Sequence, residues 1–279
     1  MPTFPADDGT EIFFTDEGSG PPLLCLAGLT RNGEDFAPIL PHLKAVRIIR
    51  MDARGRGRSA HADWRSYNIA QEARDVLTLL AHLALPAVGV LGTSRGGLVA
   101  LALAAAAKDR LLAVALNDIG PEIMPEGLAV ISGYLGRRPT ARTLEAAAAS
   151  LSRDPAFPGV PMTRWMEVAA ARFAEGPGGL ALRYDPALRD AVLGSERTGE
   201  AGDAGPPGDG WSLFAALDGL PLALIRGVNS DILAPEVADE MARRRPDMIR
   251  AEVPDRGHVP FLDEPEALAA LSAWQEEWA

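Results

Sequence analysis

The sequence offers little that would cross-link, export or anchor the chain. Cys25 is the one cysteine among 279 residues, so no intrachain disulfide can form, and its apolar surroundings predict a buried strand residue. No basic residue precedes Arg31, whereas signal and transit peptides need positive charge near their start. The longest apolar run, Gly96 to Ala107, is too short to cross a bilayer. We therefore expect a cytoplasmic protein without membrane insertion.

Positive charge is also scarce. The formal net charge is −11 and the isoelectric point is about 4.9. A negative field of this size repels phosphate backbones, which argues against nucleic acid as a partner. Hydrophobic residues make up 47% and charged residues 23% of the chain, the usual balance for a globular protein. The composition favours a small molecule as the partner and leaves the oligomeric state open.

Apolar runs of strand length recur along the chain. They are Leu23–Ala27, Val46–Met51, Val88–Leu91, Leu112–Leu116, Leu222–Ile225 and Ile249–Val253. Because these runs lack polar alternation, they suit strands that are covered on both faces. Helical patterns at 71–83, 98–107 and 264–278 fall between or after them, and Asp8-Gly9 indicates a hairpin turn near the start. This order predicts an α/β fold with a mostly parallel central sheet flanked by helices.

The region from Pro121 to about Gly210 departs from this alternation, and no strand is predicted in it. Its helical pieces are Leu144–Leu151, Thr163–Phe173 and Pro186–Leu193. It closes with a segment rich in glycine and proline, Gly199 to Gly210. We predict an all-helical cap (lid) insertion at residues 121–210 between two parts of an α/β core, 1–120 and 211–279. The alternative is a second independent domain.

A Gly-x-Ser-x-Gly pattern lies at Gly92, Ser94 and Gly96, directly after one apolar strand and at the start of a helix. In this strand–turn–helix context the glycines leave room for a tight turn that forces the serine into a strained conformation. The serine hydroxyl then stands at the carboxyl end of the sheet, where the helix N-terminus favours a developing negative charge. The pattern predicts Ser94 as a catalytic nucleophile.

A serine hydroxyl needs a base, and the chain has four histidines. His42 and His82 fall in helical stretches, and His61 lies in an arginine-rich loop. His258 follows the last strand and precedes the last helix, so it emerges at the same sheet edge as the serine. We predict His258 as the general base, with His61 as a distant alternative.

The base in turn needs a carboxylate that holds its tautomer. Two aspartates follow strands in the required region: Asp231, after Leu222–Ile225, and Asp118, after Leu112–Leu116. We favour Asp231, because its strand–loop context and the chain order serine, aspartate, histidine both suit a catalytic triad. Asp118 remains the rival.

An oxyanion hole needs two hydrogen-bond donors. The main-chain N–H of Arg95, directly after the serine, is the first candidate. The second should come from the loop after an earlier strand, and we choose the Leu29 N–H, with Gly28 as the neighbouring alternative.

These motifs, together with Asp52-Ala-Arg-Gly-Arg-Gly-Arg-Ser59, resemble the α/β-hydrolase superfamily over essentially the full chain. The sequence looks most like small bacterial carboxylesterases and enol-lactone hydrolases. The resemblance implies a helical cap over the strand ends. Two departures stand out: Ala27-Gly28 replaces a usual His-Gly pair, and Arg95 replaces Met, Gln or His. Since a cation at a helix N-terminus opposes the helix dipole, we expect Arg95 to contact a cap carboxylate or a polar group of the substrate.

The predicted activity is hydrolysis of a carboxylic ester or lactone through an acyl-enzyme, without metal or other cofactor. One alternative keeps the same residues but cleaves a C–C bond or uses peroxide in a perhydrolysis. Another is a ligand-binding receptor with a vestigial site. Family dehalogenases and epoxide hydrolases use an aspartate nucleophile, so Ser94 argues against both.

Overall fold

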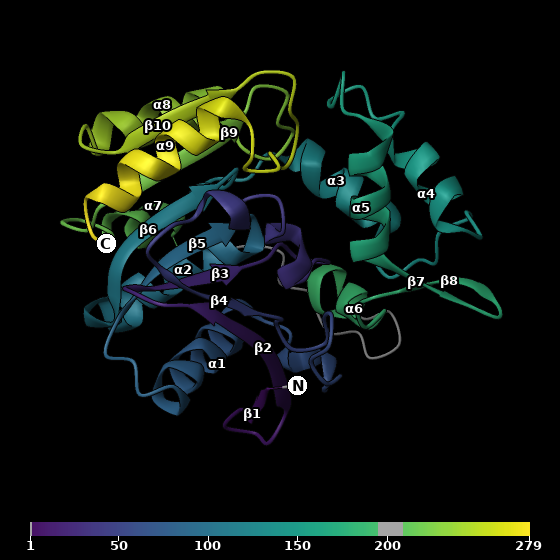
Figure 1. Ribbon diagram of the computed structural model, residues 1–279, viewed down its shortest axis with the longest axis horizontal. Helices are drawn as coiled ribbons and strands as arrows, with labels where there is room; N and C mark the ends of the chain where they lie inside the picture. The colour runs from purple at the N-terminus through teal and green to yellow at the C-terminus, as the bar shows by residue number, and fades with distance from the viewer. Residues whose placement is uncertain (1, 195–208) are drawn as a thin grey trace.

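Strands form the centre of the molecule (Figure 1). The structure, a computed structural model, describes residues 2–194 and 209–279. Its strands are β1 (Thr3–Pro5), β2 (Glu11–Gly18), β3 (Pro22–Leu26), β4 (Arg47–Met51), β5 (Val88–Thr93), β6 (Leu111–Asn117), β7 (Phe173–Gly176), β8 (Gly179–Leu182), β9 (Leu222–Gly227) and β10 (Ile249–Val253). Each apolar run predicted as a strand is one, with bounds that differ by at most two residues. The hairpin predicted near the start is also confirmed, since β1 and β2 pair antiparallel around Asp8 and Gly9.

The main sheet determines where the strand ends lie. Within the described residues it has eight strands in the order β1-β2-β4-β3-β5-β6-β9-β10. From β4 to β10 neighbouring strands run parallel, and only the first two strands are antiparallel to their neighbours. The carboxyl ends of the parallel strands therefore meet at one edge, the usual place for a ligand in such a sheet. The mostly parallel sheet predicted from the sequence is confirmed.

Helices follow most of the strands. They are α1 (Ile69–His82), α2 (Arg95–Ala107), α3 (Pro125–Tyr134), α4 (Leu144–Leu151), α5 (Met162–Arg172), α6 (Leu188–Leu193), α7 (Gly210–Ala215), α8 (Pro235–Arg244) and α9 (Pro265–Glu276). Four short 3-10 helices are η1 (Gly33–Phe36), η2 (Leu40–His42), η3 (Trp64–Ser66) and η4 (Lys108–Arg110). The helical patterns predicted at 71–83, 98–107 and 264–278 correspond to α1, α2 and α9.

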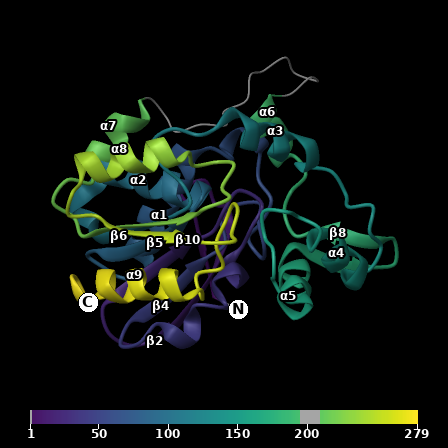
Figure 2. The ribbon, with the colours of Figure 1, turned by 90° about the horizontal axis from the view of Figure 1, so that it is seen from above.

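Both faces of the sheet are covered, which explains why its central strands β3, β5, β6 and β9 are largely apolar. Leu24 and Val90 pack on one face with α1, α2, α7 and α8. Their chain neighbours Cys25 and Leu91 pack on the other face, against α9 and η1. Figure 2 shows α9 and α8 on opposite sides of the strands. Cys25 is buried as predicted, and burial raises the pKa of its thiol to about 12.

The elements α3 to α6, with β7 and β8, lie to one side of the sheet (Figure 1). The predicted helical pieces there correspond to α4, α5 and α6, but the prediction of an all-helical insertion is wrong. β7 and β8 form an antiparallel hairpin, because Gly176–Gly179 reverses the chain in a tight turn. Gly179 has a φ of +95° there, a conformation that favours glycine. The glycine-rich segment predicted at 199–210 lies, up to residue 208, outside the described residues.

The segment of residues 121–194, which we call the cap, is tied to the arginine-rich loop after β4. The N–H of Gly57 donates to the carbonyl of Arg183, and the N–H of Asp185 donates to the carbonyl of Gly55, both at 2.7 Å. The Tyr67 hydroxyl adds a 2.6 Å hydrogen bond to the Asp185 carboxylate. One end of the cap is therefore fixed to the core by backbone contacts.

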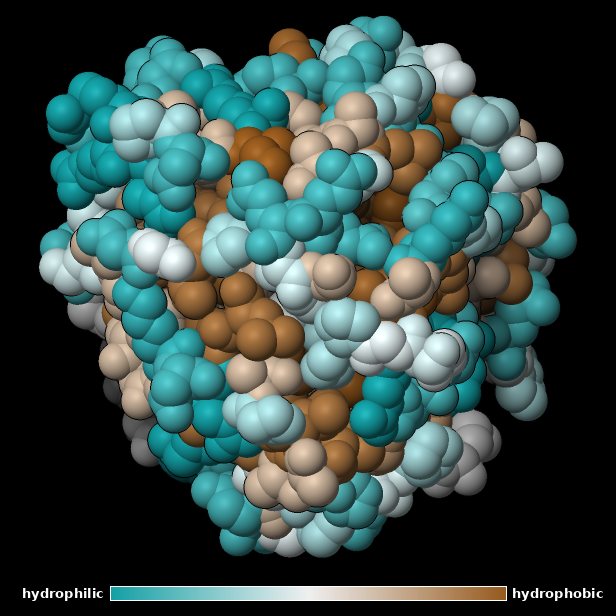
Figure 3. All heavy atoms as spheres, turned by 60° about the vertical axis from the view of Figure 1, so that its left-hand side comes forward, coloured by the Kyte–Doolittle hydropathy of each residue, from teal (hydrophilic) through white to brown (hydrophobic). Residues whose placement is uncertain are grey.

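The surface mixes polar and apolar residues. Figure 3 shows apolar residues reaching the surface in several patches that hydrophilic residues divide. Such a distribution is ordinary for a folded protein, since much of any protein surface is apolar. Among the described residues, no helix combines the length and apolarity needed to cross a bilayer.

Candidate active site

Ser94 occupies the sharp turn that the sequence predicts between β5 and α2. Its backbone has φ 51° and ψ −118°, a strained conformation for a residue other than glycine. A methyl group on Gly92 would lie 2.7 Å from the backbone of Gly96, and one on Gly96 would lie 2.1 Å from the carbonyl oxygen of Leu26. Both glycines are therefore required by close backbone contacts, which hold Ser94 at the end of the sheet.

A continuous series of hydrogen bonds joins Ser94, His258 and Asp118. His258 Nε2 lies 2.8 Å from Ser94 Oγ, and His258 Nδ1 lies 2.7 Å from Asp118 Oδ2. The Asp118 side chain is fully buried and also accepts hydrogen bonds from the Gly227 N–H (2.9 Å) and the Ser230 hydroxyl (2.6 Å). When Nδ1–H donates to this carboxylate, Nε2 is free to accept the proton of the serine hydroxyl.

The prediction that Asp231 holds the His258 ring is wrong, because Asp118 occupies that position. Asp231 lines the same cavity as Ser94 and His258. The chain order that favoured Asp231 fits both aspartates, and the order of the strands in space decides between them. β6, which ends just before Asp118, is the direct neighbour of β5, whereas β9 lies one strand further away.

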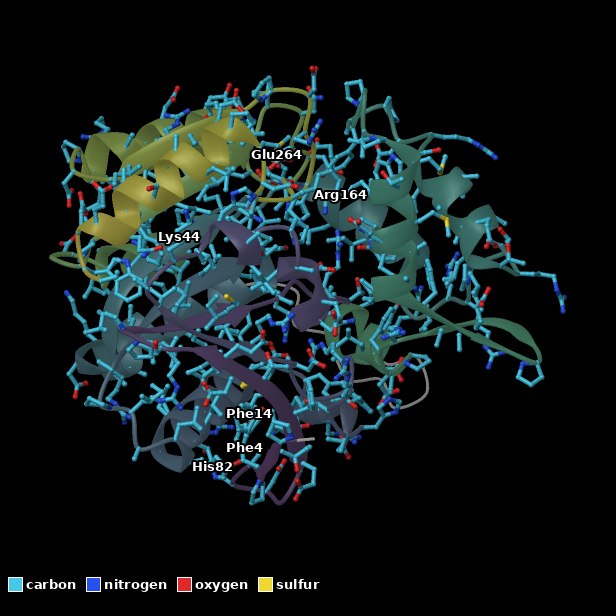
Figure 4. The ribbon with its side chains drawn as sticks, viewed as in Figure 1. Phe4, Phe14, Lys44, His82, Arg164 and Glu264 are labelled. Atoms are coloured by element: carbon cyan, nitrogen blue, oxygen red, sulfur yellow. The ribbon has the colours of Figure 1, made fainter. Side chains whose placement is uncertain are left out.

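The loop that carries His258 passes back over the end of β9. A methyl group on Gly227 would lie 2.5 Å from the carbonyl oxygens of Arg256 and Gly257, so only glycine permits this crossing. Glu264 then fixes the far side of the loop by accepting hydrogen bonds from the N–H groups of Phe261 (3.1 Å) and Leu262 (2.9 Å). Figure 4 labels Glu264 just before α9, beside the cap residue Arg164.

The other histidines lie away from this series. His82 stacks on Phe4 at the far end of α1, as Figure 4 shows. His42 ends η2, and His61 is exposed, 3.5 Å from Asp185. Of the predicted site residues, the structure thus brings Ser94 and His258 together and leaves His61 outside.

Leu29 and Arg95, the predicted oxyanion-hole residues, flank Ser94. Leu29 and Ser94 line one cavity, and Arg95 directly follows the serine at the first position of α2. Within the described residues, neither main-chain N–H donates a hydrogen bond to the protein. Two free N–H groups beside the serine are what an oxyanion hole requires.

A buried ion network connects these two residues. Arg56 Nε donates to the Leu29 carbonyl at 3.0 Å, and an Arg56 Nη pairs with Glu72 at 2.9 Å. Glu72 also pairs with Arg95 Nε at 2.9 Å. Burial opposes the ionisation of Glu72, but the two guanidinium groups lower the pKa of its carboxyl below the ordinary value. The network ties the loop after β3 to the start of α2.

This network corrects the expectation for Arg95. A carboxylate does balance its charge, but that carboxylate belongs to Glu72 of α1 and not to the cap or a substrate. Arg95 is 5% exposed, so its guanidinium is enclosed in the core. A partial signal is present in the sequence, because Glu72 falls in the helical pattern at 71–83, and the structure buries this first turn of α1.

The cavity around Ser94 and His258 has a volume of about 230 Å³. Its apolar wall includes Phe157, Trp165 and Phe261. Arg31, from the loop after β3, and Arg172, from the end of α5, are the cations that line it. Neither arginine was predicted from the sequence. For Arg172 the reason is that no sequence pattern shows that the end of a cap helix lies at the cavity of Ser94. Within the described residues, no cluster of His, Cys, Asp and Glu is arranged to hold a metal ion.

The chain is similar in sequence to known proteins. The model of the alpha/beta hydrolase family matches residues 23–271. A 3-hydroxybutyrate-oligomer hydrolase of Cupriavidus necator is 37% identical over 254 residues, covering 88% of this chain and 85% of that protein. A non-heme haloperoxidase of Rhodococcus erythropolis is 36% identical over 139 residues, covering 47% of this chain and 50% of that protein.

A solved structure extends the likeness to the whole fold. An alpha/beta hydrolase from Novosphingobium aromaticivorans has a TM-score of 0.90 and 36% identity, and the match covers 99% of this chain and 97% of that one. The fold class and the family resemblance inferred from the sequence are both confirmed.

Proposed function

We propose, from the premise that this chain belongs to the alpha/beta hydrolase family, that it hydrolyses a carboxylic ester or lactone through an acyl-enzyme. Ser94 is the nucleophile, His258 the general base and Asp118 the carboxylate that orients His258. The observation that carries the proposal is the series of 2.8 Å and 2.7 Å hydrogen bonds from Ser94 through His258 to Asp118, in a cavity beside two free N–H groups.

In the first half of the reaction Ser94 Oγ attacks the ester carbonyl carbon while its proton passes to His258 Nε2. The carbonyl oxygen becomes an oxyanion, which accepts hydrogen bonds from the N–H groups of Leu29 and Arg95. Asp118 stabilises the imidazolium. The intermediate then collapses, the C–O bond to the alcohol breaks, and His258 returns the proton to the leaving oxygen.

In the second half water attacks the acyl-enzyme as its proton passes to His258 Nε2. Collapse of this second intermediate breaks the bond to Ser94 Oγ and releases the carboxylic acid. His258 returns the proton to the serine, so the residues end as they began.

In this proposal the insertion predicted at residues 121–210, which contains the cap, covers the core of residues 1–120 and 211–279. Phe157 and Trp165 of the cap and Phe261 of the core pack edge to face or tilted, with ring centroids 5.7 to 6.1 Å apart. These rings line the cavity, so they exclude water from the acyl group and restrict its size. The likeness to a 3-hydroxybutyrate-oligomer hydrolase supports small oxygen esters as the substrates to try first.

Labelling and product analysis test the proposal together. A fluorophosphonate should label Ser94 in the native chain, and the Ser94→Ala variant should remain unlabelled. The native chain should turn over at least one of p-nitrophenyl acetate, a lactone and a dimer of 3-hydroxybutyrate. Absence of labelling, with no turnover of the panel, would reject the assignment and favour a ligand-binding receptor.

Perhydrolysis is the second candidate, supported by the likeness to a non-heme haloperoxidase over half of that protein's length. The acyl-enzyme would then react with hydrogen peroxide to give a peracid. Adding peroxide to the ester assay and measuring peracid separates this activity from hydrolysis. A dienone acid in the same panel tests the third use of the site, cleavage of a C–C bond.

A further inference from the structure

Among the residues that the structure describes, Arg172 is the arginine of the active-site cavity whose side chain makes no ion pair or hydrogen bond. Among the described residues it takes part in no ion pair, and its Nε–H is buried without a hydrogen-bond acceptor. Burial lowers the pKa of its guanidinium to about 10, and the nearby Arg31 cation acts in the same direction. Arg172 therefore remains charged at neutral pH, in a place where an unpaired charge is costly.

Other arginines of this region have partners. Arg164, on the same helix, pairs with Glu167 and Asp263. Arg31 pairs with Asp35 at 2.9 Å. Arg183 donates from Nε to the carbonyl of Phe173 at 3.1 Å. The Arg172 side chain differs from these because its N–H groups have no acceptor among the described residues, and it lines the cavity that contains Ser94.

Arg31 lines the same cavity as Arg172 and lies close to Ser94. A methyl group on Gly28 would lie 3.4 Å from Cγ of Arg31 and 3.6 Å from Cβ of Ser94, so the two side chains flank the same glycine. One arginine from the core and one from the cap thus line the space where an ester would meet Ser94.

We propose that Arg172, assisted by Arg31, binds a carboxylate group of the substrate, so that this enzyme prefers esters whose acyl or alcohol part carries a free carboxylate. A guanidinium presents two parallel N–H donors that match the two oxygens of a carboxylate. The inference rests on the proposed ester hydrolysis and adds the class of ester to it.

The other charged groups of the cavity limit the ligand to a single negative charge. Asp154 and Asp231 line it together with Arg31, Arg172 and His258. Two carboxylates repel a second charge on the ligand, which disfavours a phosphate dianion. The volume of about 230 Å³ also suits a short acyl group better than a long chain.

The test compares one ester in two charge states. The substrate is the dimer of 3-hydroxybutyrate, which carries a free carboxylate, and its methyl ester, which has the same ester bond without the charge. We expect the native chain to have a higher kcat/KM for the acid, and Arg172→Gln to lower the ratio of acid to methyl ester by about 10- to 100-fold. Arg172→Lys keeps the charge and should restore part of the ratio.

Arg153→Gln is the matched control, because Arg153 is an exposed cap arginine that lines neither this cavity nor its larger neighbour. It removes the same charge from the cap and should leave the ratio unchanged. A ratio that Arg172→Gln does not alter would overturn the inference, as would an equal loss in Arg153→Gln.

Binding measurements on an inactive variant distinguish a failure of the proposed carboxylate site from a failure of the proposed ester hydrolysis. In a Ser94→Ala background, calorimetry should detect the dimer acid and lose at least tenfold in affinity when Arg172→Gln is added. If the native chain hydrolyses neither form while the inactive chain still binds the acid through Arg172, the proposed activity fails and the carboxylate site stands. If both forms are hydrolysed equally and the acid does not bind, the carboxylate site fails and the ester activity stands.

Discussion

The sheet edge and the cap both line one cavity, but their polar groups differ in whether the protein supplies hydrogen-bond partners for them. At the sheet edge Asp118 accepts three hydrogen bonds and is fully buried, and the hydroxyl of Ser94 and both nitrogens of His258 are engaged. In the cap, Arg172 carries an N–H without an acceptor among the described residues. Groups that must keep their geometry through a reaction are held by the protein, whereas a group that must receive a ligand is left open.

The largest effect should come from the sheet edge. Ser94→Ala removes the nucleophile and should lower kcat by a factor on the order of 10⁴–10⁶, with a comparable loss for His258→Ala. Steady-state kinetics on the best ester of the panel measures both. Thermal unfolding of the variants controls for misfolding, and nearly full activity in either variant would contradict the roles assigned to them.

The next largest effect on kcat should come from Asp118, and Asp231 provides the comparison. Asp118→Asn places an amide where His258 Nδ1–H must donate, which favours the wrong tautomer and should lower kcat by about 10³–10⁴. Asp231→Asn is the matched control, because Asp231 lines the cavity without a hydrogen bond to His258 within the described residues. It should change kcat by less than about threefold. A larger loss in Asp231→Asn than in Asp118→Asn would restore the assignment made from the sequence.

Asp118 and Asp231 also show how much of the site can be predicted from the sequence. Ser94 and His258 were predictable because each has a local signal: glycines at fixed spacing after a strand, and a histidine between the last strand and the last helix. The choice between Asp118 and Asp231 depended on which strand lies beside β5, and that order arises only when the sheet assembles. The strand–loop context that favoured Asp231 carried no information about that order.

The cap was less predictable than the core for a related reason. The core strands are apolar because helices cover both faces, so their sequences carry a strong signal. β7 and β8 are short and partly exposed strands of an isolated hairpin, and their glycine-rich turn resembles a linker. Arg172 ends a helix with an ordinary sequence, and only the folded cap brings it to Ser94.

The buried ion network of Arg56, Glu72 and Arg95 should have a smaller effect on activity but a clear effect on stability. Glu72→Gln leaves the Arg56 and Arg95 cations buried together and should cost about 3–5 kcal/mol in the free energy of unfolding. Denaturant unfolding measures this cost. Glu167→Gln, which breaks an exposed pair with Arg164, should cost less than about 1 kcal/mol and serves as the control.

The effect of Glu72→Gln on the free energy of unfolding should depend on pH, because the pKa of Glu72 is shifted in the folded chain. Because the pKa of Glu72 is lower in the folded chain than in the unfolded chain, its ion pairs contribute fully above the unfolded value of about 4.3. The contribution falls as the pH drops below that value and the carboxyl becomes protonated. The difference in unfolding free energy between the native chain and Glu72→Gln should therefore shrink below about pH 4. A difference that stays constant there would contradict the role of this charge.

The smallest effect should come from the ion pair that links the two regions. Arg164 on α5 pairs with Asp263 in the loop that carries His258, and it lies over the ring of Phe261 with 5.4 Å to the centroid. Both partners are partly exposed, at 20% and 27%, so solvent screens their attraction. Arg164→Ala should lower the unfolding free energy by about 1 kcal/mol or less and the Tm by about 2–4 °C.

High salt should reduce this loss, because the pair is near the surface. Arg153→Ala removes an exposed charge from the cap without breaking the junction, so its Tm should not change. The backbone hydrogen bonds of Gly57 and Asp185 hold the other end of the cap and are untouched by either substitution. A Tm loss well above 5 °C in Arg164→Ala would mean that this junction, and not those backbone contacts, holds the cap against the sheet edge.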